Sequence, residues 1–406
     1  MECTMKECDK KKKQRKLIGK INPFIFAIAD FALKPIYSIK YGLKIDRKAI
    51  RNIKGPAIVL ATHTSDQDHI LSGLTFYPVR PTYIVSEHFM HSPSTAPLLR
   101  HMHVITKKMF TPDVSTIINI MRAKKENAII LIFPEGRLSC YGHTLPLTDG
   151  TAELIKKLGV NVYIWKAEGA YLTFPKWRNK GDNRKGKINA SVKLLMTAED
   201  VEKMELDEIR DLSSKAILND DELAMQGVEY KSKTMAEGVD KILFKCPICK
   251  KEGTITSEGA HIRCTECGLD ATLDNYYRLH DAPFERVNEW FEWQQNSIDT
   301  NTEFLQSKAR FGCCGEDDMM DENAGEGEIY LDKNIFKFSG TLHGELVEFE
   351  VEPEKIRAFP ITPGVHFDIY HKGRLIYVYP LPDTRMSTKW LCFLDKLMAE
   401  KEKAHN

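Results

Sequence analysis

Short apolar runs alternate with helix-like segments through the first half of the chain. Residues 57–61 and 128–133 are apolar throughout and bounded by polar residues, which is typical of strands buried on both faces. Residues 115–125 between them carry apolar side chains at helical spacing. Further helices and strands are predicted up to residue 217. This alternation predicts an α/β domain, with a mixed sheet flanked by helices.

The last eighty or so residues have a different period. Residues 347–351 alternate apolar side chains with glutamates, which indicates a half-buried strand, and residues 367–370 and 375–379 flank a turn and indicate a hairpin. A closing helix is predicted from the spacing of Met386, Trp390, Phe393, Leu394 and Leu397. Short strands followed by one helix resemble, in topology, a pleckstrin-homology or GRAM-type domain.

The segments between these two regions differ in polarity. Residues 219–239 are polar and are predicted to be a linker, residues 284–305 are predicted to be a helix, and the acid-rich run 316–328 is predicted to be a flexible connection. The predicted units are a basic tail with an amphipathic membrane-anchoring helix (1–45), the α/β domain (46–240), a small cysteine-bearing unit (241–275), a helix with the acidic linker (276–325) and the β-rich domain (326–406).

Composition and charge exclude several classes of protein. The 406 residues are 42% apolar, enough for two to four domains with buried cores. A net charge of +1 provides no overall field that would attract nucleic acid. No uncharged apolar run reaches the roughly 18 to 20 residues that a bilayer-spanning helix needs.

Positive charge is concentrated at the N-terminus. Residues 1–20 hold eight basic and three acidic residues, and an apolar stretch interrupted by prolines and charges follows over residues 21–43. A basic run beside an aromatic-rich helix predicts peripheral binding of residues 1–43 to an anionic membrane, at its cytoplasmic inner face. The alternatives are a solvated tail followed by a core helix, and a secretory signal cleaved near residue 29, for which the apolar run is short.

Four of the ten cysteines form two C-x-x-C pairs, Cys246 with Cys249 and Cys264 with Cys267. Four thiolates at this spacing suit a tetrahedral zinc ion, and a segment so poor in apolar residues needs the metal to fold. We therefore predict a structural zinc ribbon that serves structure or protein interaction. Two disulfides, a redox pair or a nucleic-acid-binding ribbon are the alternatives, although nucleic acid is not expected as a partner because nearby charges balance. The other six cysteines show no pairing pattern, as in a reducing cytoplasm.

A histidine and an aspartate follow the first predicted strand. His63 and Asp68 are five positions apart, so they cannot face each other within one regular helix. They can meet if His63 lies in a turn and Asp68 begins the next helix. The carboxylate would then orient the imidazole as a general base. Asp66 is a second carboxylate that could contact the imidazole or cap the helix, and a structural role for His63 is the simplest alternative.

A second polar cluster follows the strand that ends near residue 133. Glu135 can accept hydrogen bonds from hydroxyl groups, Gly136 permits close backbone approach, and Arg137 can hold a phosphate by its fork of donors. Ser139 completes the cluster. Because ligands of α/β sheets gather at the carboxyl ends of strands, both clusters are expected at one site that suits a phosphate-bearing polyol.

The ordered pair H-x-x-x-x-D at 63–68 and F-P-E-G at 133–136 resembles the glycerolipid acyltransferase superfamily, that of the 1-acyl-sn-glycerol-3-phosphate acyltransferases. The resemblance covers roughly residues 45–215. It implies that an acyl group passes from acyl-CoA or acyl-carrier protein to a hydroxyl of a lysophospholipid such as lysophosphatidic acid, in phospholipid biosynthesis. His63 would be the base, with no covalent acyl-enzyme and no catalytic metal. The basic residues between the motifs, Lys107 and Lys108, would bind phosphate.

The chain departs from the family pattern at the second motif. Arg137 stands one place early, Leu138 occupies the usual arginine position, and Thr62 replaces an asparagine. These changes leave the proposed base intact and affect the acceptor pocket. The competing hypotheses are a catalytically weakened, lipid-binding adaptor with the same fold, and a zinc-ribbon regulator that binds nucleic acid. Acyl chain length, donor carrier, acceptor head group and oligomeric state do not follow from the sequence.

Overall fold

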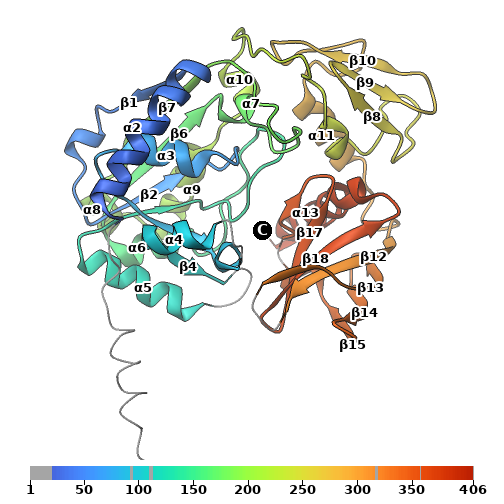
Figure 1. Cartoon of the computed structure of the whole chain (residues 1–406). Coiled ribbons are helices and arrows are strands. Elements are labelled where there is room, and N and C mark those ends of the chain that lie inside the picture. The colour runs from blue at the N-terminus through green and yellow to red at the C-terminus, as the bar shows by residue number, and fades with distance from the viewer. Residues whose placement is uncertain (1–20, 92–94, 109–112, 316–318, 357, 406) are drawn as a thin grey trace, which may run out of the picture.

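The computed structural model describes residues 21–91, 95–108, 113–315, 319–356 and 358–405. Three units follow one another along the chain (Figure 1): an α/β unit, a small unit of short strands, and a C-terminal β unit closed by a helix. The basic part of the predicted membrane anchor, residues 1–20, lies outside the described residues.

A seven-stranded mixed sheet organises the α/β unit. β6 and β7 pair antiparallel, and all other neighbouring strands in the sheet are parallel. This confirms the predicted α/β class. In sheet order the strands are β1 (Leu43–Asp46), β7 (Ile188–Met196), β6 (Asn161–Glu168), β2 (Ala57–Ala61), β5 (Ile129–Ile132), β3 (Thr82–Ser86) and β4 (Ile105–Lys107).

Helices cover both faces of this sheet. Ala57, Val59 and Ala61 of β2 pack with α2 and α3, while Ile58 and Leu60 pack with helices of the opposite layer. This is why the central strands are apolar at every position. The first layer contains α2 (Pro23–Lys40) and α3 (Asp68–Phe76), and the second contains α5 (Val114–Lys125), α6 (Thr151–Leu158), α8 (Ala198–Lys203) and α9 (Leu206–Ile217). The remaining helices of the unit are α4 (Ala96–Met102), α7 (Ala170–Thr173) and α10 (Asp221–Ala224).

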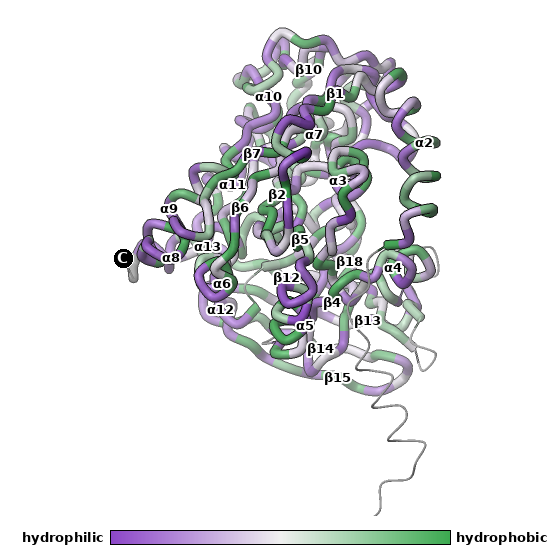
Figure 2. The backbone as a smooth tube through the Cα atoms, turned by 90° about the vertical axis from the view of Figure 1, so that its left-hand side faces the viewer, coloured by the Kyte–Doolittle hydropathy of each residue, from purple (hydrophilic) through white to green (hydrophobic). Residues whose placement is uncertain are grey.

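Helix α2 lies on the outside of the molecule (Figures 1 and 2). Phe24, Ile28, Phe31 and Ile39 are all exposed, Phe31 at 84%, whereas the polar Asp30 is buried toward Arg47. The helix therefore presents an apolar face away from the core. Among the described residues, no helix is both long enough and apolar enough to cross a bilayer.

The segment predicted as a linker, residues 219–239, is packed and not free. It contains α10, and Asp221, Tyr230 and Met235 are buried within it. The prediction was wrong because polar residues of the segment take part in its packing: the Asp221 carboxylate accepts hydrogen bonds from Asn219 Nδ2 at 2.7 Å and from the Tyr171 backbone N–H at 2.8 Å.

The small unit is an antiparallel sheet in the order β11-β10-β9-β8. Its strands are β8 (Ile255–Glu258), β9 (His261–Cys264), β10 (Asp270–Leu273) and β11 (Leu279–His280). The following helix, α11 (Val287–Asn296), is shorter than predicted from residues 284–305. Asp299 ends that region in a turn, because its carboxylate accepts from the Asn301 N–H at 3.0 Å and the Thr302 hydroxyl at 2.8 Å.

The C-terminal unit is a second seven-stranded sheet, antiparallel throughout and closed by one helix, as predicted. The structure corrects the acidic linker, because residues 320–331 form β13 of this sheet. Glu326 and Glu328 point to solvent, while Gly325 and Gly327 let the neighbouring strand approach closely. In sheet order the strands are β15 (Glu345–Val351), β14 (Phe336–Leu342), β13 (Met320–Leu331), β12 (Leu305–Cys314), β18 (Arg374–Leu381), β17 (His366–His371) and β16 (Ile361–Thr362), with helices α12 (Pro353–Ile356) and α13 (Ser387–His405).

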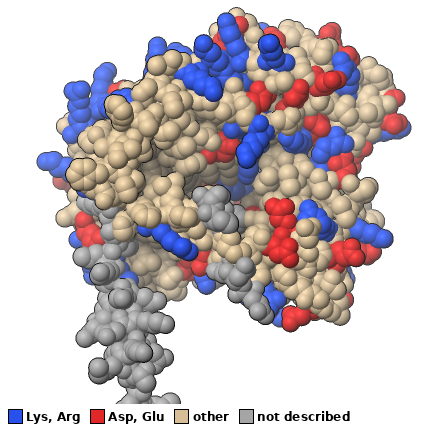
Figure 3. Space-filling view, in the orientation of Figure 1, with Lys and Arg blue, Asp and Glu red and all other residues tan. Residues whose placement is uncertain are grey.

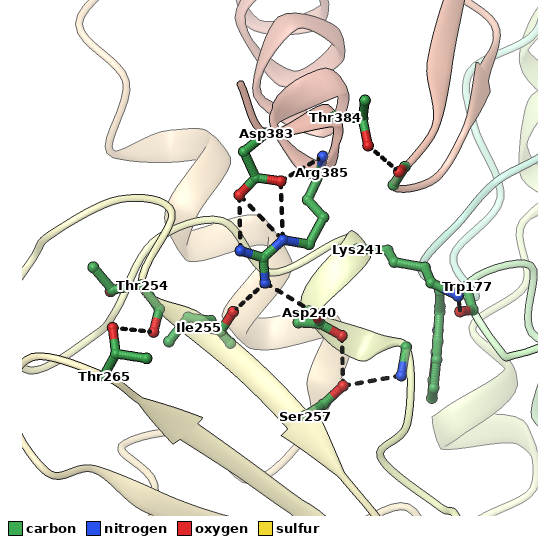
Figure 4. A network of polar contacts seen from close by, with 12 residues as sticks. Trp177, Asp240, Lys241, Thr254, Ile255, Ser257, Thr265, Asp383, Thr384 and Arg385 are labelled. Carbon is green, nitrogen blue, oxygen red and sulfur yellow. Dashed lines mark hydrogen bonds and ion pairs between the residues drawn. The ribbon is translucent and has the colours of Figure 1, made fainter. Parts of the chain in front are cut away.

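The three units share one buried hydrophobic cluster. It extends from Trp177 of the α/β unit through Ile255 of the small unit to Trp390 of α13. A polar network joins the small unit to the C-terminal unit (Figure 4). Arg385 donates to the Asp240 carboxylate at 3.0 Å and to the Ile255 carbonyl oxygen at 2.8 Å. The C-terminal unit is therefore held against the rest of the chain at defined points.

Candidate active site

His63 and Asp68 meet at the carboxyl end of β2. His63 lies in the turn after the strand, and Asp68 is the first residue of α3. His63 Nδ1 is 3.0 Å from Asp68 Oδ2. The structure thus brings this predicted pair together in the predicted turn-to-helix geometry.

The other contacts of Asp68 define the tautomer of His63. Asp68 is buried at the N-terminus of a helix, and its Oδ2 also accepts a hydrogen bond from the Ser65 backbone N–H at 2.9 Å. Burial raises the pKa of Asp68, whereas the helix end and the backbone N–H donors of Ser65 and Thr64 favour its carboxylate form. We assign the contact with His63 to that carboxylate form. Nδ1 of His63 therefore carries the proton, and Nε2 has a free lone pair that can accept one.

The surroundings keep His63 neutral. Its side chain is 25% exposed and stacks on Phe133, with ring centroids 4.3 Å apart. Burial, followed by the positive charge of Lys176, lowers the pKa of His63 to about 3. At neutral pH the imidazole is thus in the form that a general base requires.

Glu135 connects the two motifs through the backbone. β2 and β5 are parallel neighbours, with Leu60 opposite Ile132, so His63 and Glu135 each lie three residues beyond this pair. Glu135 Oε1 accepts the His63 backbone N–H and Oε2 accepts the Leu145 backbone N–H, each at 2.7 Å. Because Glu135 is buried and each of its oxygens already accepts a backbone N–H, we assign it a positioning role in place of the predicted contact with substrate hydroxyls. Burial raises the pKa of Glu135 to about 8, while the two N–H donors oppose that shift.

Gly136 and Ser139 shape the same loop. Gly136 has a φ of +74°, and a Cβ there would approach the Thr148 side chain to 2.7 Å, so only glycine fits. The Ser139 backbone N–H donates to the His63 carbonyl oxygen at 2.9 Å. Its hydroxyl is buried and has no hydrogen-bond partner among the residues that the structure describes. Gly136 thus shapes the loop after β5, and Ser139 joins that loop to the backbone of His63.

Arg137 does not face an open phosphate site. Its guanidinium forms an ion pair with Asp395 of α13, in the C-terminal unit, and both side chains are largely buried. The prediction of Arg137 as the phosphate-holding residue is therefore corrected: in this structure its charge is already matched by a carboxylate 258 positions away in sequence.

Two further cations lie near the first motif. The Arg178 guanidinium is 3.2 Å from Asp66 Oδ2, so Asp66 pairs with arginine and not with the imidazole. The Lys176 ammonium donates to the Ile361 carbonyl oxygen of the C-terminal unit at 2.6 Å. The sequence interpretation missed Lys176, Arg178 and Asp395, and only the basic residues that directly follow α7 offered a local signal for the first two.

Lys107 and Lys108 lie at the carboxyl end of β4, at the same edge of the sheet as His63 but three strands away from β2. β4, which ends at Lys107, is separated from β2 by β5 and β3. At about 4.8 Å per strand, this places the strand axes roughly 14 Å apart. Phosphate binding by Lys107 and Lys108 stays a prediction, and it concerns a place away from the His63–Asp68 pair.

The four predicted metal ligands also come together, in the small unit. All four sulfur atoms lie within 4.8 Å of one another, with Cys246 Sγ 3.6 Å from Cys267 Sγ and Cys249 Sγ 3.8 Å from Cys264 Sγ. Zinc–sulfur bonds of about 2.3 Å in a tetrahedron require sulfur–sulfur distances of about 3.8 Å. The cluster can therefore hold a metal ion, and its donor set fits zinc.

Comparison with known proteins identifies the class of the first unit. Residues 43–165 match the family model described as Acyltransferase, so this part of the chain is an acyltransferase-family domain. The matched segment contains both motifs. Among solved structures, the chain is similar to the crystal structure of the 1-acyl-sn-glycerophosphate (LPA) acyltransferase PlsC from Thermotoga maritima, with 17% identity over 48% of this chain and 78% of that chain and a TM-score of 0.38.

Proposed function

We propose that the protein transfers a fatty acyl group from an acyl thioester, acyl-CoA or acyl-carrier protein, to a hydroxyl group of a lysophospholipid. The observation that carries this proposal is the contact between His63 Nδ1 and Asp68 Oδ2 within the acyltransferase-family segment. It leaves Nε2 of a neutral imidazole free beside the ends of β2 and β5.

The reaction needs no covalent enzyme intermediate. Nε2 of His63 takes the proton of the acceptor hydroxyl as the oxygen attacks the thioester carbonyl carbon. When the tetrahedral intermediate collapses, the carbon–sulfur bond breaks and the imidazolium returns the proton to the leaving sulfur. Asp68 stabilises the imidazolium during this cycle and holds the ring in place, while Glu135 fixes the backbone of His63.

An acylation assay across a panel of lysophospholipids, with acyl-CoA and acyl-carrier protein as donors, tests this function. His63→Ala should lower kcat by about a hundredfold or more. His69→Ala is the matched control, because His69 is an exposed histidine of α3, one position after Asp68. Transfer that is unchanged in His63→Ala contradicts the mechanism, and the absence of transfer to every acceptor favours the lipid-binding adaptor.

The exposed apolar face of α2 is proposed to bind the surface of an anionic membrane such as the cytoplasmic face of a cell membrane. The exposure of Phe24 and Phe31 supports this, because two large aromatic side chains on one outward face gain free energy when they enter the lipid interface. Replacing both by serine should abolish most sedimentation with anionic vesicles. Since neither residue is in the core, the unfolding temperature should not change.

The cysteine cluster is proposed to hold one structural zinc ion, with no zinc-dependent chemical step. Metal analysis of the purified chain should find about one zinc ion, which Cys246→Ser with Cys249→Ser removes. Replacing Cys140 and Cys392, which lie outside the cluster, should leave the zinc content unchanged.

A further inference from the structure

Three cationic side chains lie around the dyad, and two of them are already neutralised by carboxylates. Arg137 pairs with Asp395, and Arg178 pairs with Asp66 at 3.2 Å. A phosphate that bound to either arginine would have to displace an existing ion pair.

Lys176 differs from both arginines. Its ammonium donates to a neutral acceptor, the Ile361 carbonyl oxygen at 2.6 Å, and no carboxylate forms an ion pair with it among the described residues. Lys176 is partly enclosed between the α/β unit and the C-terminal unit, and burial lowers its pKa. A cation held without a paired anion in such a place is costly unless a ligand supplies the negative charge.

The position of Lys176 relates it to both motifs. Burial is the main cause of the lowered pKa of His63, and the charge of Lys176 adds to it, while the charges of Asp66 and Arg137 act on Lys176 in turn. Asp368 raises the pKa of Lys176, but the Asp368 carboxylate is 2.9 Å from His366 Nδ1 and so is shared with that ring. On the face shown in Figure 3, the surface is hollowed between the α/β unit and the C-terminal unit, with charged side chains at its rim.

We propose that Lys176 is the specificity-determining cation that binds a phosphate group of a substrate beside His63. This inference rests on the proposed acyl transfer and extends it to the substrate's charged group. Both substrates carry phosphate: the acceptor in its head group and an acyl-CoA donor in its nucleotide. In a lysophosphatidate the phosphate is attached one carbon from the reacting hydroxyl carbon, so the cation that holds it must lie close to the base.

Equilibrium binding of two fragments tests this without turnover. sn-Glycerol 3-phosphate represents the acceptor head group, and adenosine 3′,5′-diphosphate represents the donor nucleotide. Lys176→Met should weaken the binding of one fragment at least tenfold, and Lys176→Arg should retain most of it. The fragment affected identifies the source of the phosphate.

Lys156→Met is the matched control, because Lys156 also donates only to backbone carbonyl groups, at the end of α8 and away from the site. Equal binding by the wild type and Lys176→Met, no binding of either fragment by the wild type, or an equal loss in Lys156→Met overturns the proposal.

Kinetics separate this proposal from the proposed function. In Lys176→Met, KM for the phosphate-bearing substrate should rise at least tenfold while KM for a monoacylglycerol acceptor changes little. A chain that binds a fragment through Lys176 but transfers no acyl group would refute the proposed function and leave the phosphate site standing.

Discussion

The loops that follow β2 and β5 leave neighbouring strands of the sheet, but the contacts that stabilise them differ in sequence separation. In the first loop, the contact that we propose to be catalytic joins His63 to Asp68, five positions away, and the Ser65 backbone N–H donates a further hydrogen bond to Asp68. In the second loop, Glu135 reaches back 72 positions to His63, and Arg137 reaches forward 258 positions to Asp395. The base is thus built locally, whereas the charges around it depend on the C-terminal unit.

This difference separates two parts of the proposed function. The proton-transfer chemistry depends on a short segment with its own strand, turn and helix. The proposed recognition of the substrate's negative charge depends on contacts with the C-terminal unit. Asp395 of α13 neutralises Arg137, and the Ile361 carbonyl oxygen of β16 accepts a hydrogen bond from Lys176. Changes in the first loop should therefore lower kcat, and changes at the C-terminal contacts should act on KM and on stability.

The largest effect is expected from Asp68→Asn. An amide cannot stabilise the imidazolium and can donate to Nδ1, which favours the wrong tautomer of His63. We expect kcat to fall about a hundredfold to ten-thousandfold, with KM nearly unchanged. Steady-state kinetics measure this, and Asp66→Asn is the matched control because Asp66 pairs with Arg178. A larger loss in Asp66→Asn would mean that the wrong carboxylate has been assigned.

Asp395→Ala should reduce stability by about 3 kcal/mol, because it leaves the buried Arg137 without its counter-charge. Denaturant unfolding measures this loss, and Glu402→Ala, an exposed acid on the same helix, should change stability by less than about 0.5 kcal/mol. Arg137→Met combined with Asp395→Leu should recover much of the stability. If Asp395→Ala is as stable as the wild type, the C-terminal unit does not hold the second loop in this way.

Glu135→Gln should have an intermediate effect on kcat. The amide nitrogen would face one of the two backbone N–H groups that Glu135 now accepts, so the loop that carries His63 should shift. Leaving one buried N–H donor without its acceptor costs about 2 kcal/mol, which corresponds to a loss of about thirtyfold in rate. Kinetics and thermal unfolding together should show loss of rate with an unchanged acceptor preference. A changed preference would instead return Glu135 to the role of a substrate ligand.

The smallest expected effect is on the pH dependence of stability. The pKa of His63 is about 3 in the folded protein and near 6.5 in the unfolded chain, so the unfolded chain binds the extra proton first as the pH falls. The contribution of His63 is therefore nearly complete at pH 7.5 and decreases toward acid, by about 1.4 kcal/mol at pH 5.5. Comparing the unfolding of His63→Gln with the wild type at pH 7.5 and 5.5 isolates it. A difference that does not change with pH would show that His63 is not held neutral.

Local patterns predicted the local parts of the molecule. The strands at residues 57–61 and 129–132, the helices around them and the closing helix follow from periodicity, because burial on one or two faces leaves a repeating signature. The meeting of His63 with Asp68 followed from their spacing. The acid-rich run was wrongly predicted to be a flexible connection. Most of it belongs to β13, whose acidic side chains face solvent, so a high content of acids did not exclude a strand.

The charge pairs of the site could not be predicted in the same way. Neither Arg137 nor Asp395 differs in sequence from an ordinary exposed residue, and their pairing depends on how the third unit packs against the first. The position of Glu135 was easier to predict, because Glu135 and His63 each lie three residues beyond a pair of opposite residues, Ile132 and Leu60, in neighbouring parallel strands. The ion pairs between residues far apart in sequence could therefore be identified only from the structure.

The most direct test of the central claim is a double-mutant cycle in which kcat for acyl transfer is measured for the wild type, His63→Ala, Asp68→Asn and the double variant. If the two residues form one catalytic unit, the double variant should be no slower than His63→Ala, within about threefold. Losses that multiply, or a His63→Ala variant as fast as the wild type, would contradict the account.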